Sequence, residues 1–161
     1  MIFVFVRSIV SGVLLIAVTA SLSAQPADKR TWRLRSEAGQ SFLTYGTDNA
    51  EDTPITFSCK AGRGAVEVFI NETAAGVKAG RSMPASLTAD SVTAKLSGRT
   101  MTNEEAGTPS FRGAMAASDP LFAALRPAKQ LAMTVGPSRQ QVPLKEIGDK
   151  ADKFARLCAK R

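Results

Sequence analysis

Two cysteines, Cys59 and Cys158, are the residues of this 161-residue chain best able to form a covalent bond or to bind a metal. Catalytic thiol pairs are normally close in sequence, as in Cys-x-x-Cys. These two lack that spacing, and two distant cysteines cannot supply the three or four thiolates of a cysteine-rich zinc site. A structural disulfide is the remaining use for them, provided that the chain reaches an oxidising compartment.

The chain has no histidine. Ser-His-Asp and Cys-His catalysis, histidine metal sites and histidine pH switches are therefore excluded. The Ser-x-x-Lys spacing of serine–lysine hydrolases is missing, and the Gly-Arg-Gly stretch at 62–64 lacks the spacing and the Lys-Ser/Thr pair of a phosphate-binding loop. We predict no catalytic residue, no metal site and no cofactor.

Paired carboxylates, as in glycoside hydrolysis, are the catalytic chemistry that the composition still allows. The candidates in the strand-rich part are Asp48, Glu51, Asp52, Glu67, Glu72, Asp90, Glu104, Glu105 and Asp119. Most of them lie in predicted loops, where a carboxylate is usually solvated. The loop at 47–52 also lacks the ligand spacing and the central glycine of an EF-hand calcium site. We therefore predict that the protein is not an enzyme, and keep a carboxylate-dependent glycan hydrolase as an alternative.

The N-terminal residues have the three parts of a secretory signal peptide: a positive charge at Arg7, an apolar run over 9–20, and small residues after it. We expect cleavage between Ala20 and Ala24, so that residues 1–24 are removed. A retained membrane anchor is the alternative, although Arg7 interrupts the apolar stretch. No cysteine follows the run, so the chain does not have the attachment point of a lipoprotein.

Residues 25–161 show no internal repeat and no long linker, so we predict one domain without a stable membrane span after processing. Export places the thiols in an oxidising compartment, where a pair of cysteines usually forms a bridge. We therefore predict a disulfide between Cys59 and Cys158, which closes a loop of about 100 residues.

The chain is basic, with 21 Lys and Arg against 14 Asp and Glu and a formal net charge of +7. A basic exported protein is attracted to lipid headgroups, polyphosphates or acidic glycans. Nucleic acid is not an expected partner, because the aromatic residues are sparse and are not interleaved with basic ones. A cationic group near the C-terminus is expected to be the solvated face of a helix; it consists of Lys145, Lys150, Lys153, Arg156, Lys160 and Arg161.

Alternation of apolar and polar residues predicts strands through most of the domain. Trp32 and Leu34 fall on one face of the first strand, and Arg33 and Arg35 fall on the other. Further strands are expected at 41–45, 53–59, 65–70, 82–89, 91–98, 99–104, 110–117 and 131–135. Their partner around 142–144 contains Pro143, which indicates the edge of a sheet.

Helices are expected at two places. Asp119 is a suitable N-cap for a short helix at 120–125, and the period changes to 3.6 in a terminal helix at 149–159. The apolar side of that helix is predicted to contain Ile147, Ala151, Phe154, Leu157 and Cys158. Because Cys59 shares a strand face with Ile55 and Phe57, the bridge would link the helix to the sheet. The fold class is mainly β, an antiparallel β-sandwich or flattened barrel with a short helix and a C-terminal helix.

A signal peptide, a Trp near the mature N-terminus, the stretch "LTYGTDNAEDTPITFSCKAGRGAVEVFI", and "VPL" followed by "ADKFARLC" give the chain a characteristic layout. This layout resembles small exported bacterial proteins of the invasion-associated locus B type. The resemblance implies a Gram-negative periplasmic location and a non-enzymatic envelope role, and it carries over no catalytic residue set.

These observations predict a periplasmic binding or envelope-associated protein whose partner is an unknown protein or an anionic envelope component. Inhibition of an exported enzyme is an alternative, which requires a protruding loop. The segments at 46–53 and 99–109 are the candidates for such a loop. A basic inhibitor would suit an acidic target enzyme.

Overall fold

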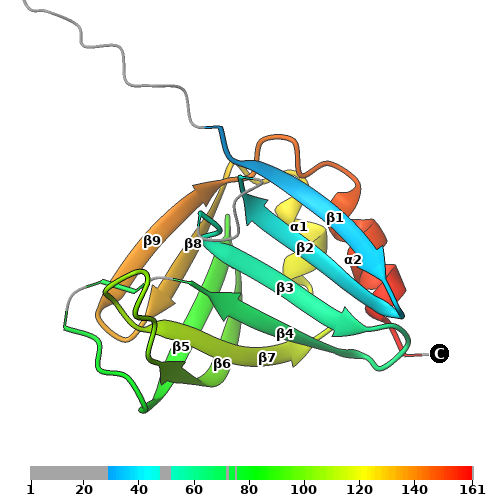
Figure 1. The fold of residues 1–161 in the computed structure, drawn as a ribbon. Coiled ribbons are helices and arrows are strands. Elements are labelled where there is room, and N and C mark those ends of the chain that lie inside the picture. The colour runs from blue at the N-terminus through cyan, green and yellow to red at the C-terminus, as the bar shows by residue number, and fades with distance from the viewer. Residues whose placement is uncertain (1–28, 48–51, 72, 75, 161) are drawn as a thin grey trace, which may run out of the picture.

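Antiparallel pairing organises most of the chain in a computed structural model, which describes residues 29–47, 52–71, 73–74 and 76–160 (Figure 1). The described residues form nine strands in one sheet, together with two helices. The strands are β1 (Thr31–Glu37), β2 (Gln40–Gly46), β3 (Ile55–Lys60), β4 (Ala65–Ile70), β5 (Ser82–Ala89), β6 (Val92–Met101), β7 (Ser110–Ala116), β8 (Gln130–Val135) and β9 (Ser138–Pro143). The helices are α1 (Leu121–Leu125) and α2 (Lys150–Cys158).

The sheet curls so that its first and last strands approach each other. Its strand order is β1-β2-β3-β4-β7-β6-β5-β8-β9, and every pairing is antiparallel. The indole N–H of Trp32 in β1 donates a hydrogen bond of 2.8 Å to the carbonyl of Pro143 in β9. The strands therefore form one curled antiparallel sheet, in which β1 and β9 are the two end strands. This mainly β arrangement with two short helices confirms the predicted fold class, and β9 is an edge strand as Pro143 indicated.

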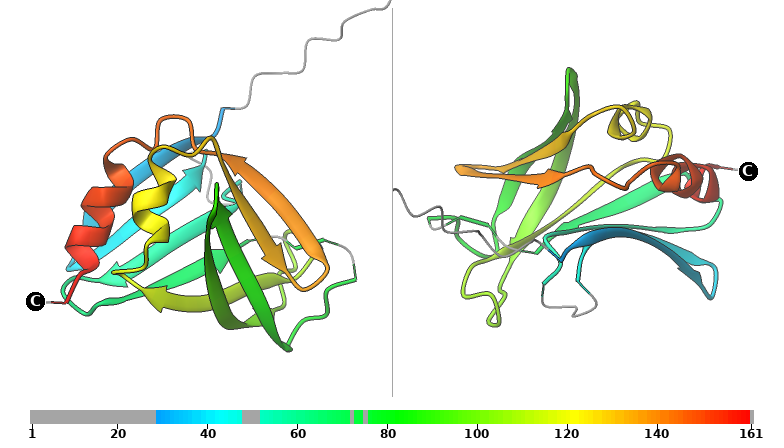
Figure 2. Two further views of the ribbon diagram at one scale, coloured as in Figure 1. Left: turned by 180° about the vertical axis from the view of Figure 1, so that it is seen from behind. Right: turned by 90° about the horizontal axis from the view of Figure 1, so that it is seen from above.

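Helices α1 and α2 lie inside the curl (Figure 2). Helix α2 contacts β1 and β2, α1 contacts β5 and β6, and the helices contact each other. Phe57 of β3 lies between them, with ring centroids 5.7 Å from Phe122 of α1 and 6.4 Å from Phe154 of α2. Buried aromatic residues of this kind contribute a large part of the stabilising apolar area. The core is thus made by the inward faces of the strands and the apolar sides of the helices.

The predicted disulfide between Cys59 and Cys158 is present, with 5.7 Å between the Cα atoms. Both cysteines are buried, as their positions on the apolar faces of β3 and α2 indicated. The β3–β4 loop also supports the end of α2, because the Gly62 N–H donates to the carbonyl of Leu157 and the Gly64 N–H donates to that of Cys158. These bonds satisfy carbonyls that the helix end would otherwise leave unpaired.

Some element boundaries differ from those expected from sequence. The segments at 91–98 and 99–104 are not separate strands, because residues 92–101 run continuously as β6 along both β5 and β7. Ile147 is buried but precedes α2, and Leu157 is only partly buried. Helix α1 begins at Leu121, one residue later than expected, and its N-cap is Pro120 in place of Asp119. A carboxylate oxygen of Asp119 accepts a 2.9 Å hydrogen bond from the N–H of Leu121.

The predicted signal peptide, residues 1–24, lies outside the described residues. Within the described part of the chain, no helix is long and apolar enough to cross a membrane.

Candidate ligand trough on the outer face

The side chains that alternate with the core residues form the outer face of β1–β4 and β7, which is turned toward the viewer in Figure 1. The strand register arranges them in two rows across the sheet. One row consists of Arg33, Thr44, Thr56, Phe69 and Arg112. The other consists of Arg35, Phe42, Ser58, Glu67 and Ala114. Small hydroxyl residues therefore occupy the middle of this face, between the long cationic side chains of β1 and β7.

This difference in side-chain size hollows the face. A depression of about 440 Å³, called the trough below, lies over β1–β4. It is lined by Arg33, Arg35, Glu37, Phe42, Thr44, Thr47, Thr53, Thr56, Phe69 and Asn71. A second depression of about 670 Å³ shares Phe42 with it and extends toward Glu67 and Arg112. The two depressions are therefore neighbours across β2–β4, with Phe42 between them.

Two phenylalanines give the trough its apolar part. Phe42 of β2 and Phe69 of β4 are only partly buried, although both strands already place their other apolar residues in the core. In the register, Phe42 lies opposite Arg35 and Phe69 lies opposite Arg112. An aromatic ring next to a guanidinium offers a ligand both a π face and a positive charge.

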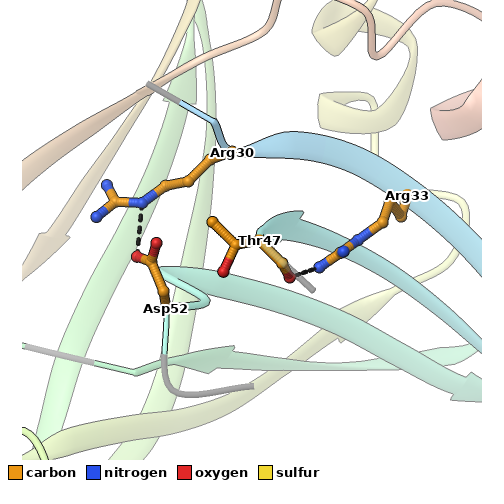
Figure 3. A network of polar contacts seen from close by, with 4 residues as sticks. All are labelled: Arg30, Arg33, Thr47 and Asp52. Atoms are coloured by element: carbon orange, nitrogen blue, oxygen red, sulfur yellow. Dashed lines mark hydrogen bonds and ion pairs between the residues drawn. The ribbon is translucent and has the colours of Figure 1, made fainter. Parts of the chain in front are cut away.

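One end of the trough is held by polar contacts, shown in Figure 3. Nη2 of Arg33 donates to the main-chain carbonyl of Thr47, just after β2. Nε of Arg30 lies 2.7 Å from Oδ1 of Asp52, which ties the start of β1 to the chain that leads into β3. The bond to Thr47 positions the Arg33 guanidinium at this end of the trough.

The remaining arginines differ in their charge partners. Arg112 forms an ion pair of 2.8 Å with Glu67, in which the side chains are 56% and 44% exposed. Such an exposed pair contributes little to stability, about 1 kcal/mol at most. Arg35 has no ion-pair partner in the described ranges, and it is exposed on the rim of the trough. The trough lining carries two arginines, Arg33 and Arg35, against one carboxylate, Glu37, so its formal charge is positive. Arg35 is the lining guanidinium most open to an anionic ligand.

The candidate carboxylates are dispersed over the described molecule. Asp52 pairs with Arg30, Glu67 pairs with Arg112, and Asp119 accepts the N–H of Leu121 at the start of α1. Asp90 lies in the β5–β6 turn, and Glu104 and Glu105 are exposed in the segment after β6. Asp48, Glu51 and Glu72 lie outside the described residues. The described residues contain no group of three or more Cys, Asp or Glu side chains placed to hold a metal ion.

The segment at 99–109, one of the loops considered for an inhibitor, is held close to the sheet. Strand β6 includes its first three residues, and the side-chain amide of Asn103 donates to the Asn71 carbonyl and to the Ser110 hydroxyl at 3.0 and 2.9 Å. The Asn103 side-chain oxygen accepts the N–H of Ala106. In the other segment, at 46–53, residues 48–51 lie outside the described part of the chain.

The trough is the feature that sequence reasoning missed. Alternation placed Arg33 and Arg35 on the face opposite Trp32 and Leu34, but which residues of the other strands lie beside them depends on strand register. The sequence did contain one indication of it. Phe42 and Phe69 alternate with the core residues of their strands, so they belong to the outer face. An aromatic residue out of phase with the core is a surface feature that needs an explanation.

Fold and surface together define a curled antiparallel sheet with an outer trough of aromatic, hydroxyl and cationic side chains. Comparison with family models, with curated proteins and with solved structures gives no match for this chain.

Proposed function

We propose that the protein is an exported, non-enzymatic binding protein of the Gram-negative envelope, and that its trough holds an acidic glycan. The observation that carries this proposal is the row-by-row placement of Phe42 and Phe69 beside Arg35 and Arg112 on an open sheet face. Export is supported by the buried disulfide, because such bonds persist mainly in oxidising compartments.

The charge of the trough supports an anionic ligand. Guanidinium groups match carboxylates in a planar, two-bonded geometry, and such charge-assisted hydrogen bonds are about twice as strong as neutral ones. Arg35 is exposed at the rim, where it can meet a carboxylate without losing an existing ion pair within the described structure. A uronate residue of a polysaccharide carries such a carboxylate on each ring.

The other lining residues support a sugar in preference to an acyl chain. The C–H groups of a pyranose ring can pack on the electron-rich face of an aromatic side chain, here Phe42 or Phe69. Hydroxyls of Thr44 and Thr56, which lie 3.5 Å apart in the middle of the trough, can exchange hydrogen bonds with sugar hydroxyls. A hydrocarbon chain would offer these hydroxyls no hydrogen bond beyond the long one between them, and burying hydroxyls with unused hydrogen-bonding capacity is costly.

Calorimetric titration with an oligomer of galacturonate tests this proposal, with a neutral dextran oligomer of the same length as the comparator. We expect binding of the galacturonate oligomer alone. Arg35→Gln should weaken it about threefold to tenfold, since an exposed charged contact contributes about 1 kcal/mol. Phe69→Leu, which keeps the apolar character and removes the ring, should also weaken it.

Arg139→Gln is the matched control, because Arg139 is an exposed arginine on β9, away from the trough. Its affinity should equal that of the unaltered protein. The proposal is wrong if dextran binds equally well. It is also wrong if Arg35→Gln and Phe69→Leu bind like the control, because attraction to the net positive charge would then explain the binding.

A further inference from the structure

We propose that the free edge of β1 is a docking site for an extended acidic segment of a partner protein, which pairs with β1 as an added strand. Strand addition at a sheet edge is a common mode of peptide recognition, in which main-chain hydrogen bonds supply affinity and side-chain pockets supply specificity. This surface lies beside α2 and is separate from the trough, so the inference goes beyond the function proposed above.

The pairing of β1 with β2 leaves main-chain groups at this edge. Both residues of the connecting turn, 38–39, have positive φ, as in a type I′ hairpin. In such a hairpin Glu37 and Gln40 form a hydrogen-bonded pair, and hydrogen-bonded and non-hydrogen-bonded pairs then alternate along the ladder. The main-chain N–H and C=O groups of Leu34 and Ser36 therefore point away from β2, toward the free edge.

A groove of about 480 Å³ runs beside those groups. It is lined by Leu34 and Ser36 of β1 and by Asp149, Lys150, Lys153 and Arg156 at or in α2. The three cations are three residues apart, so they follow one another along one side of the helix. The carboxylate of Asp149 lies 3.4 Å from Arg126, which offsets part of its charge. The groove therefore lies between the strand that carries the outward N–H and C=O groups and the cationic side of α2.

The edge strand at the opposite end of the sheet, β9, is less suited to the addition of a strand. By the alternation of pairs in the β8–β9 hairpin, the nitrogen of Pro143 faces away from β8, and proline has no N–H to donate. The carbonyl of Pro143 already accepts the hydrogen bond of the Trp32 indole. Proline at an outer edge is a known protection against strand addition. In β1 the corresponding edge positions are Leu34 and Ser36, which keep their N–H groups.

Charge selects the occupant of the β1 edge. A second copy of this chain would bring its own Lys150, Lys153 and Arg156 toward the same three cations, and like charges facing each other oppose association. An extended segment that contains Asp or Glu at alternate positions would place its carboxylates toward Lys150, Lys153 and Arg156. The same cations thus oppose self-pairing and favour an acidic partner.

A fluorescein-labelled ten-residue peptide of alternating glutamate and valine serves as the probe, with fluorescence anisotropy as the measurement on the oxidised protein. Ser36→Pro removes one outward N–H without removing a donor of the β1–β2 ladder, and should lower the affinity at least tenfold. Ser36→Ala keeps the N–H but loses the hydroxyl that lies 2.9 Å from the Ser41 hydroxyl, so it is the reference against which the loss in Ser36→Pro is measured. Gln141→Pro, which places a proline at an outward position of β9, should also bind normally.

The charge requirement is tested by the triple variant Lys150→Gln, Lys153→Gln and Arg156→Gln, for which we expect a similar loss of affinity. A peptide of alternating serine and valine should bind at least tenfold more weakly than the acidic one. Equal binding of the two peptides, or unchanged affinity in the triple variant, would overturn the acidic specificity.

Native-state hydrogen exchange keeps the proposal testable if Ser36→Pro impairs folding. Addition of the peptide to the unaltered protein should slow exchange of the Leu34 and Ser36 amides, because they would become hydrogen-bonded. Unchanged exchange at these amides, or unchanged affinity in a folded Ser36→Pro variant, would refute strand addition. Sedimentation showing a dimer that Ser36→Pro dissociates would assign the edge to a second copy and would also contradict the proposal.

Discussion

Trp32 joins the strands at the opposite ends of the sheet. Its ring is buried against Tyr45 and Phe57, with centroid distances of 5.4 and 6.4 Å, while its N–H donates to Pro143. Packing against Tyr45 and Phe57 fixes the position of the Trp32 ring. In this position its N–H forms the hydrogen bond that connects β1 with β9. One side chain therefore contributes both to the core and to the closure of the curl.

Trp32→Phe should destabilise the protein by about 1–3 kcal/mol, because it removes the hydrogen bond to Pro143 and leaves a smaller ring in the site. Urea unfolding followed by far-UV circular dichroism measures this, since the variant lacks the chain's only tryptophan. An unchanged unfolding midpoint would show that the bond between Trp32 and Pro143 does not contribute to stability.

Gly98 of β6 and Gly113 of β7 are paired in the register. Because neither has a side chain, they leave space for the ring of Phe111. A Cβ atom at Gly98 would lie 2.3 Å from the Phe111 ring and 2.3 Å from the Arg112 carbonyl. A Cβ atom at Gly113 would also lie too close to Phe111, at 2.8 Å. The glycines are thus needed for side-chain space, in a part of the sheet where Phe111 is fully buried.

Gly98→Ala should therefore cost about 1–3 kcal/mol of unfolding free energy, the usual range for overfilling a packed core. Ser97→Ala is the control, since Ser97 is exposed on the same strand and should change stability by about 0.5 kcal/mol or less. Urea denaturation of the two variants compares them directly. Equal stability of the two variants would contradict the packing argument.

At the scale of elements, α2 is joined to the β3–β4 hairpin by a covalent bond and by the hydrogen bonds from Gly62 and Gly64. Gly64 has φ of 75°, a conformation that favours glycine, and a Cβ atom there would lie 3.2 Å from Cβ of Lys160. The hairpin therefore fits closely around the end of the helix. The disulfide adds to this contact by restricting the unfolded chain.

The double variant Cys59→Ala and Cys158→Ala should lose up to about 4–5 kcal/mol of unfolding free energy, because the bridge spans 99 residues in sequence. Urea unfolding of the oxidised protein and of the variant measures the difference. If the loss were below about 1 kcal/mol, packing and the hairpin bonds would be sufficient to hold α2, and the entropic role of the bridge would be refuted.

Local patterns predicted most elements because alternation and helical period are readable within a few residues. The inward positions of Trp32, Phe57 and Cys59 followed from period two, and that of Phe154 followed from period 3.6. The continuity of β6 could not be read in this way, since its small residues give a weak pattern and Gly98 looks like a break. That glycine serves the Phe111 ring, which comes from another strand.

The disulfide was predictable from the candidate site residues, and the trough was not. The pairing of the cysteines could be predicted from the expected export and from the positions of Cys59 and Cys158 on the apolar faces of their elements. The outer face that holds the trough places Phe69 of β4 beside Arg112 of β7, which is the neighbour of β4 because β5 and β6 are placed beyond it. Such cross-strand order depends on tertiary pairing, and strand periodicity carries no information about it.

For the whole molecule, the filled interior directs ligand binding to the outside. In larger barrels the lumen can hold a ligand. Here α1 and α2 occupy the concave side, and Phe57, Phe122 and Phe154 pack between them and the sheet. The trough lies on the convex face, and the groove lies between an edge strand and α2. Variants of surface residues should therefore alter binding with little change in stability.

The position of the disulfide along the chain also determines how the molecule responds to a pulling force. The bond encloses residues 59–158 in a covalent ring, so tension between the two ends bypasses β4–β9, α1 and α2. Mechanical stretching of the oxidised protein should release β1, β2 and the part of β3 before Cys59, and should then stop lengthening. In a reducing buffer the same pull should extend the whole chain, by up to about 3.6 Å for each added residue. Optical-trap extension curves recorded in the two buffers measure this difference, and curves of equal length would show that the ring does not carry the load.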